Sequence, residues 1–163
     1  MWDLPKQVIL TSGVGVGSTE INAYDNALLN AGVGDYNLVK VTSVLPAGAI
    51  VSHNAEICRS YISKFPKGVI IPSVYTMKVS KRRGETISSA LAIGIPKNQD
   101  SSGMIFEASL TGTKEVAEDL AKQMLIEALK TRNIMDYDVV STSSEVTIVR
   151  GIGCTVSLAI MLP

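Results

Sequence analysis

Apolar residues recur along the chain with the two spacings that distinguish helices from strands. Two segments repeat them every three or four residues: Ile21, Tyr24, Leu28 and Ala31 in the first, and Val116, Leu120, Met124 and Ala128 in the second. This spacing places each set on one face of a helix, so we expect helices over residues 19–31 and 113–132. Ser18 or Thr19 should cap the first helix and Thr113 the second, because hydroxyl side chains accept hydrogen bonds from the free amides there.

Further segments rich in β-branched and apolar residues predict strands. The clearest is 36–45, in which Leu38, Lys40, Thr42 and Val44 alternate with Asn37, Val39, Val41 and Ser43. The others are 7–11, 68–80, 86–95, 104–110, 138–150 and 154–162, whereas 47–67 has no clear pattern. Many strands with two helices predict an α/β fold of the α+β type, in which helices cover layers of sheet.

Composition and charge narrow the possible functions. The 163 residues fit one domain, and a hydrophobic content of 46% is enough for a sizeable core. The chain balances 15 Lys and Arg against 15 Asp and Glu. Proteins that bind nucleic acid usually carry a basic excess, so we expect no nucleic-acid partner. The short basic run 81–83 reads as a charged turn that ends at Gly84.

The cysteines and the chain ends carry no signal for a metal, a disulfide or a membrane. Cys58 and Cys154 lie far apart without a CxxC motif, so neither a metal site nor a disulfide framework is expected. The first residues lack the pattern of a signal peptide. The apolar segment 151–163 is shorter than the roughly 20 residues that span a bilayer. We therefore expect a soluble cytoplasmic protein whose C-terminal segment is a buried strand.

A glycine-rich segment between the first strand and the first helix raises the question of dinucleotide binding. Gly13, Gly15 and Gly17 are spaced as GxGxG rather than GxGxxG. The following strand carries Lys40 near its middle and has no acidic residue at its end to bind a ribose. We therefore expect a flexible turn that leads into the helix, not a phosphate site.

Thr42 and Ser43 form a hydroxyl pair near the end of a predicted strand. Taken alone, such a pair is structural, because both residues tolerate β geometry. The sole histidine, His53, belongs to no Ser-His-Asp arrangement, and no GxSxG motif is present. Residue types by themselves therefore leave the chemistry of this pair open.

A resemblance to a known family changes that interpretation. Residues 20–46, which read EINAYDNALLNAGVGDYNLVKVTSVLP, closely resemble the pyruvoyl-dependent arginine decarboxylases. GETIS at 84–88, IPK at 95–97, GMIFE at 103–107 and the glycine and cysteine at 153–154 resemble the same family in the same order. Agreement at several separated places makes the resemblance specific. The family fold is a four-layer αββα sandwich, which suits the predicted strands and helices.

The resemblance implies a precursor that cleaves itself between Thr42 and Ser43. In the family, the serine hydroxyl attacks the preceding carbonyl, the resulting ester eliminates a carboxylate, and hydrolysis of dehydroalanine releases ammonia. The single domain 1–163 would then become a β chain, 1–42, and an α chain, 43–163, that begins with a covalent pyruvoyl cofactor derived from Ser43. That group forms a Schiff base with arginine, and the products are agmatine and carbon dioxide.

The resemblance also implies catalytic roles for Asn37 and Glu107. Asn37 corresponds to an asparagine that faces the oxyanion of self-cleavage, and alternation places it on the Ser43 side of the strand. Glu107 corresponds to the proposed proton donor. A carboxyl group donates near neutral pH only where its surroundings favour the neutral form, and the adjacent apolar residues 104–106 should supply them. Without the resemblance, both residues read equally well as ordinary polar strand positions.

Four further residues are implied in substrate binding. Asp25 corresponds to an aspartate that faces the guanidinium group, which a carboxylate binds through two parallel hydrogen bonds, and Ile21, Gly34 and Tyr36 correspond to positions that line the pocket. An acidic partner favours a basic substrate without fixing its length. Decarboxylation of histidine or lysine therefore remains an alternative to arginine.

Assembly is implied by the family as well. Its members form trimers of cleaved pairs with active sites between protomers, so a homotrimer is expected. An uncleaved, non-enzymatic trimeric relative that only binds a ligand is a further alternative. The chain departs from the family in having Thr-Ser rather than Ser-Ser at the cleavage site, and Pro46-Ala47 rather than two prolines. The attacking serine is retained, so these departures bear on the substrate more than on the reaction.

Overall fold

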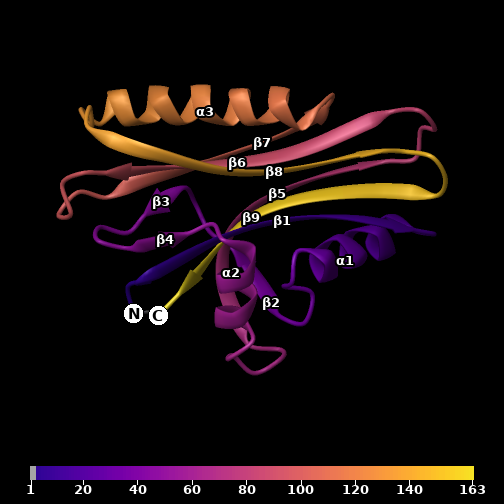
Figure 1. Ribbon diagram of the computed structural model, residues 1–163, viewed down its shortest axis with the longest axis horizontal. Helices are drawn as coiled ribbons and strands as arrows, with labels where there is room; N and C mark the ends of the chain where they lie inside the picture. The colour runs from indigo at the N-terminus through magenta and orange to yellow at the C-terminus, as the bar shows by residue number, and fades with distance from the viewer. Residues whose placement is uncertain (1–2) are drawn as a thin grey trace.

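Residues 3–163 of the computed structural model form four layers in the order helix, sheet, sheet, helix (Figure 1). The elements are β1 (Gln7–Gly17), α1 (Glu20–Asn30), β2 (Asn37–Lys40), β3 (Val44–Leu45), β4 (Ile50–Ser52), α2 (Ala55–Ile62), β5 (Ile70–Ser80), β6 (Thr86–Pro96), β7 (Gly103–Thr111), α3 (Lys114–Thr131), β8 (Tyr137–Thr147) and β9 (Ile152–Leu162). α3 covers one outer face, and α1 and α2 lie on the other. The predicted αββα sandwich is confirmed.

Two sheets pack face to face in the middle of the molecule. The larger has the strand order β2-β5-β9-β1-β4, and the smaller has the order β3-β7-β6-β8. β9 lies at the centre of the larger sheet, antiparallel to both β1 and β5. Its residues 153–162 are all buried, which confirms the predicted C-terminal strand and explains its continuous apolar sequence.

Apolar clusters fill all three spaces between the layers. Ala23 and Ala27 of α1 pack on the larger sheet, and Leu91 and Ile105 lie between the sheets. Leu125 belongs to the third cluster, beneath α3. Removal of this apolar surface from water is the main force that holds the layers together.

The predicted turn in the glycine-rich segment is wrong, because β1 continues through Gly17. A Cβ atom at Gly15 would lie 2.3 Å from both the Ala23 oxygen and the Ala27 nitrogen. At Gly13 it would lie 2.4 Å from the Ala27 oxygen, and at Gly17 2.4 Å from the Ala23 nitrogen. The backbone of α1 therefore rests directly on the backbone of β1, and the glycines are needed for that close approach rather than for a bend.

Both predicted helices are present, but the predicted buried stripes are partly wrong. Ile21 is 79% exposed, while the smaller Ala23 and Ala27 are buried. In α3 the buried row is Ala117, Ala121, Leu125 and Leu129, and Val116 and Leu120 are exposed. Two neighbouring rows of this helix are apolar with the same spacing, so periodicity does not decide between them.

The capping predictions had different outcomes. The Thr19 side chain accepts a hydrogen bond from the Asn22 amide, as expected. Thr113 is the N-cap residue of α3, but its side chain makes no capping bond. The Lys114 amide donates to the Glu145 carboxylate of β8 instead, at 2.8 Å. A residue from a neighbouring strand therefore satisfies this helix terminus.

Two other segments differ from the prediction. The expected strand 36–45 is divided into β2 and β3, which belong to different sheets. The unassigned segment 47–67 contains β4 and α2. The Asn54 side chain caps α2 by accepting from the Glu56 and Ile57 amides. This helix is only eight residues long, which is too short for its apolar period to stand out.

Candidate active site

The Thr42–Ser43 peptide lies where the chain crosses from one sheet to the other. β2 is an edge strand of the larger sheet, and β3 is an edge strand of the smaller one. The Val41 amide donates to the Ser73 oxygen at 3.0 Å, and the Ile105 amide donates to the Ser43 oxygen at 2.8 Å. The peptide is thus anchored on both sides while it lies outside both strand ladders.

The bond between these residues lies in a segment without regular structure. Thr42 is exposed and Ser43 is half-buried. Within residues 3–163, no hydrogen bond is made to the Thr42 carbonyl oxygen. A free carbonyl next to a serine hydroxyl, in a segment without regular structure, is open to attack by that hydroxyl.

Glu107 of β7 lies close to this crossing. It is two residues along the strand from Ile105, which binds Ser43. Successive side chains of a strand point to opposite faces, so Glu107 shares the face of Ile105, which lies between the sheets. Met104 and Phe106 belong to the cluster under α3 instead. Residues 104–106 were expected to surround this carboxyl group together. That expectation is wrong for Met104 and Phe106, which face α3.

Lys40 is the partner of Glu107, which the sequence analysis missed. Its Nζ lies 3.5 Å from Glu107 Oε1, and the two side chains are 54% and 22% exposed. The same Nζ lies 5.3 Å from the centre of the Tyr75 ring. A charged residue only two positions before Thr42 is the signal that could have identified it.

Tyr24 of α1 lies beside Tyr75 on the helix-covered face of the larger sheet. Burial, and then the neighbouring Tyr75, raise the pKa of Tyr24 well above its usual range. Tyr24 therefore stays neutral and serves as packing rather than as a base. The contacts of Tyr75 with both Tyr24 and Lys40 link α1 to the edge at which β2 ends.

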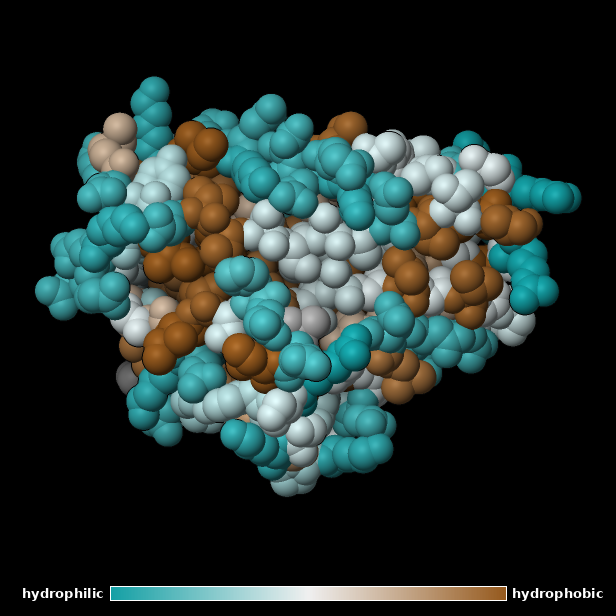
Figure 2. Space-filling model, in the orientation of Figure 1, coloured by the Kyte–Doolittle hydropathy of each residue, from teal (hydrophilic) through white to brown (hydrophobic). Residues whose placement is uncertain are grey.

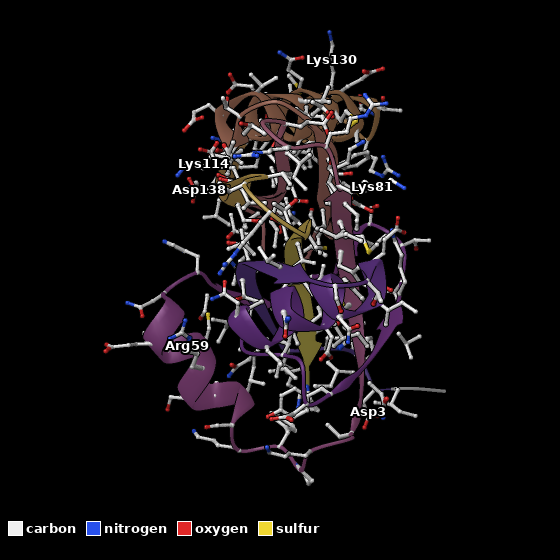
Figure 3. The ribbon with its side chains drawn as sticks, turned by 90° about the vertical axis from the view of Figure 1, so that its right-hand side faces the viewer. Asp3, Arg59, Lys81, Lys114, Lys130 and Asp138 are labelled. Atoms are coloured by element: carbon white, nitrogen blue, oxygen red, sulfur yellow. The ribbon has the colours of Figure 1, made fainter. Side chains whose placement is uncertain are left out.

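A cavity of about 450 Å³ adjoins Thr42. Thr42 lines it, together with Asp3, Leu4, Pro5, Val41, Val44, Pro46, Ala47, Pro72, Ser102 and Met161. This volume is suited to a small ligand. Asp3 adds a carboxylate that the sequence analysis also missed, because it precedes every predicted element. Figure 3 shows it at the end of the molecule far from α3.

The other candidate residues lie apart from this crossing. Ile21 and Asp25 are exposed on α1, which extends toward the end of the molecule opposite β3 (Figure 1). Gly34 and Tyr36 line a separate cavity of about 320 Å³ beside α2. The Tyr36 hydroxyl donates to the Ile62 oxygen at 2.9 Å.

Asn37 is engaged elsewhere too, since its Nδ2 donates to the Gly68 oxygen at 2.6 Å. It is exposed at the start of β2, and the remaining length of that strand separates it from Thr42. The single chain therefore brings together Thr42, Ser43 and Glu107, but not the five remaining candidates.

Metal-ligating groups, cysteines and membrane-spanning helices were also considered over the described residues. Among residues 3–163, no cluster of histidine, cysteine, aspartate and glutamate side chains has the arrangement of a metal site. Cys58 and Cys154 are both free and buried, and burial raises the pKa of Cys154 to about 11. Within the same residues, no helix is both long and apolar enough to cross a membrane.

Comparison with known proteins gives a consistent match along the whole chain. Residues 7–163 match the family model described as pyruvoyl-dependent arginine decarboxylase. A protein of that name from Pyrococcus abyssi is 35% identical over 162 residues, which cover 99% of this chain and 98% of the relative. Its namesakes from Thermococcus kodakarensis and Methanococcus vannielii are 35% and 32% identical, over 99% and 95% of this chain and 98% and 89% of the relatives.

Proposed function

Because the chain belongs to the pyruvoyl-dependent arginine decarboxylase family, we propose that it cleaves itself between Thr42 and Ser43 and then converts arginine to agmatine and carbon dioxide. The observation that carries this proposal is the position of the Thr42–Ser43 peptide. It crosses between two sheet edges, it lies outside both ladders, and it is anchored at Val41 and at Ser43, where it binds the amide of Ile105, two residues before Glu107 on β7.

Besides the Thr42–Ser43 peptide itself, self-cleavage consumes only one water molecule. The Ser43 hydroxyl attacks the Thr42 carbonyl carbon, and a C–O ester bond replaces the peptide C–N bond. Loss of the Ser43 α-proton then breaks the bond between Cβ and oxygen and expels the Thr42 carboxylate. Water hydrolyses the remaining dehydroalanine, after its tautomerisation, and releases ammonia. The anchors at Val41 and Ser43 hold the reacting atoms in place, which lowers the entropic part of the barrier.

In the decarboxylation step, the groups around the crossing have different roles. The pyruvoyl group supplies a carbonyl that accepts electrons as carbon dioxide leaves. Glu107 holds the proton that replaces carbon dioxide on the substrate; it lies on the face of β7 between the two sheets that the crossing connects. The cavity beside Thr42 receives part of the substrate.

The remaining candidate residues fit a site completed by a second protomer. We propose that Asp25 and Ile21 of α1, with Gly34, Tyr36 and Asn37 after it, face the crossing of a neighbouring chain. Their exposure, or their place beside a surface cavity, supports this arrangement. Asp25 would then bind the guanidinium group of arginine, and Asn37 would leave Gly68 to donate to the oxyanion at Thr42.

A homotrimer of cleaved αβ pairs is the assembly we propose. Apolar side chains gather on the surface over β3 and β4 (Figure 2), where Leu4, Val44 and Ile50 are exposed. Contact between protomers would remove this surface from water. Light scattering on the purified protein should give the mass of three chains of 17.3 kDa. A monomer that decarboxylates arginine at full rate would contradict the shared site.

The substrate is tested by measuring carbon dioxide release from arginine, lysine and histidine with the same preparation. Planar guanidinium pairs with a carboxylate through two hydrogen bonds, whereas an ammonium group is a point charge. We therefore expect arginine to have the highest kcat/KM, and Asp25→Asn to raise the KM for arginine more than it lowers kcat. Preference for lysine or histidine would assign the same chemistry to another substrate, and a chain that stays whole would favour a binding protein.

The proposed location is the cytoplasm. Cys58 and Cys154 are both unpaired thiols, and thiols persist in reducing compartments whereas disulfides form in oxidising ones. Fractionation of the cells that make the protein should recover it with other cytoplasmic proteins.

A further inference from the structure

The space between the two sheets changes character along its length. Near the crossing it is filled by apolar side chains such as Leu91 and Ile105. Farther along, hydroxyl side chains take the same inward positions: Ser89 is two residues before Leu91 on β6, and Thr155 and Ser157 face it from β9. All three are fully buried. Because an unpaired polar group is costly to bury, each of these hydroxyl groups needs a partner.

The hydroxyl groups form hydrogen bonds from one sheet to the other. Ser89 Oγ donates to the Thr155 carbonyl oxygen at 3.1 Å, and the Thr155 hydroxyl donates in turn to Ser89 Oγ at 2.7 Å. Ser157 Oγ donates to the Ser89 carbonyl oxygen at 2.9 Å, and Ser144 of β8 donates to the Val156 oxygen of β9 at 3.0 Å. Hydrogen bonds have preferred lengths and directions, whereas hydrophobic attraction has none. These bonds therefore fix how one sheet lies on the other.

The crossing depends on that arrangement, because its two ends are bonded to different sheets. The Val41 amide donates to the Ser73 oxygen of β5, and the Ser43 oxygen accepts from the Ile105 amide of β7. β5 is hydrogen-bonded to β9, and β7 to β6. The position of β6 relative to β9 therefore sets the distance between the two anchors. A slide of one sheet over the other would change the backbone angles at Thr42 and Ser43, and with them the approach of the hydroxyl group to the carbonyl carbon.

We infer that Ser89, Thr155 and Ser157 are positioning residues for self-cleavage. The inference rests on the proposed function: their hydrogen bonds between the sheets hold the Thr42–Ser43 peptide in the geometry from which it is cleaved. They act at a distance, since Ser89 lies four residues along β6 from the residue opposite Ile105, or about 13 Å. Apolar side chains of the same size could fill the same space, so the hydroxyl groups contribute direction rather than burial.

The test measures the rate of self-cleavage in the Ser89→Ala, Thr155→Val double variant. Both partners become apolar, so no buried side chain is left unpaired. In cells that express the protein, newly made chains are labelled with a pulse of methionine, and the uncut fraction is followed on denaturing gels during the chase. A misplacement of about 1 Å can slow a reaction about 100-fold, and because the Ser157 bond is retained we expect the uncut chain to disappear about tenfold more slowly than in the wild type.

Ser88→Ala is the matched control. Ser88 is the neighbouring residue of β6 and is also fully buried, but its Oγ donates to the Thr113 oxygen at 3.0 Å, on the side of the sheet that α3 covers. The control therefore removes a buried hydrogen bond that does not join the sheets, and its cleavage rate should equal that of the wild type. Urea unfolding in the Ser43→Ala background should place the midpoint of the double variant no lower than that of Ser88→Ala.

Single variants of Thr155 separate direction from packing, and they decide the question if the double variant fails to fold. Thr155→Val keeps the size and loses the hydroxyl group, whereas Thr155→Ser keeps the hydroxyl group and loses a methyl group. A positioning role predicts slow cleavage for valine and the wild-type rate for serine, and packing alone predicts the reverse order. Turnover per cleaved chain should match the wild type in Thr155→Val, because the cut crossing no longer joins the sheets and Ser43 stays bonded to β7, which carries Glu107.

The inference and the proposed function fail in different ways. Wild-type cleavage in a folded double variant would overturn the inference alone, and so would equal slowing by Ser88→Ala or slower cleavage in Thr155→Ser than in Thr155→Val. A wild-type chain that remains whole, or that is cut without decarboxylating any of the three amino acids, would refute the proposed function instead.

Discussion

Replacement of Gly15 by alanine should push α1 away from the larger sheet. The new Cβ would lie 2.3 Å from two backbone atoms of α1, the Ala23 oxygen and the Ala27 nitrogen, whereas ordinary contacts begin near 3.4 Å. The shortfall of about 1.1 Å must be met by the whole helix, because backbone atoms have no rotamer to change. Ala23 and Ala27 are fully buried and would lose their packing. We expect the free energy of unfolding to fall by about 3 kcal/mol, the upper part of the range for overpacked cores.

The assay is chemical denaturation in the Ser43→Ala background, so that a single uncut chain unfolds, at one protein concentration. Gly94→Ala is the control, because its Cβ would meet only side-chain methyl groups, of Leu129 at 2.5 Å and Leu125 at 3.2 Å, which can turn aside. We expect it to cost less than about 1 kcal/mol. Thermal melts should place Gly15→Ala lower by about 6–12 °C. Equal stability of the two variants would refute the view that α1 rests on the bare backbone of β1.

Three further outcomes are expected. Ser43→Ala should give one uncut band and no carbon dioxide from arginine; residual release would contradict the role of the hydroxyl group. Glu107→Gln should cleave normally yet turn over at least about 100-fold more slowly, as steady-state kinetics would show, and normal turnover would remove Glu107 from its role. Burial raises the pKa of Cys154 from 9.0 to about 11, so the folded state keeps a proton that the unfolded state loses as the pH rises through this range. The free energy of unfolding should therefore fall by about 1 kcal/mol per pH unit from pH 9 to 11 on account of Cys154, and urea titrations of Cys154→Ala should give a slope smaller by this amount, the rest being due to Cys58 and Tyr24, whose pKa values burial also raises.

The fold could be predicted where local spacing decides it, and not where contacts between layers do. The long helices and strands were predictable because each repeats its apolar period several times. The glycines of β1 wrongly suggested a turn. They are needed because Ala23 and Ala27 of α1 lie against the strand backbone, a contact that the local sequence does not reveal. The buried face of α3 was predicted wrongly for a related reason. The rows that contain Leu120 and Ala121 are both apolar, and only packing against the sheet decides that Ala121 is the buried one.

The candidate site was predictable through family resemblance alone, and only in part. The structure brings Ser43 and Glu107 close through the amide of Ile105, a contact between residues 62 positions apart in sequence that no local pattern reveals. The division of 36–45 at the crossing was also hidden, because alternation continues through Thr42 although the chain changes sheets. In the sequence, Lys40 looks like an ordinary strand residue. Only the fold places it beside Glu107 of β7.

The intact mass of the purified wild-type protein tests the central claim most directly. If a serine hydroxyl has broken its own backbone, two polypeptides will be found, and the one that spans 43–163 will be lighter than its serine-started form by one molecule of ammonia. Its first residue will also resist amino-terminal sequencing. A preparation that decarboxylates arginine while its full 163-residue mass remains undivided would contradict the account.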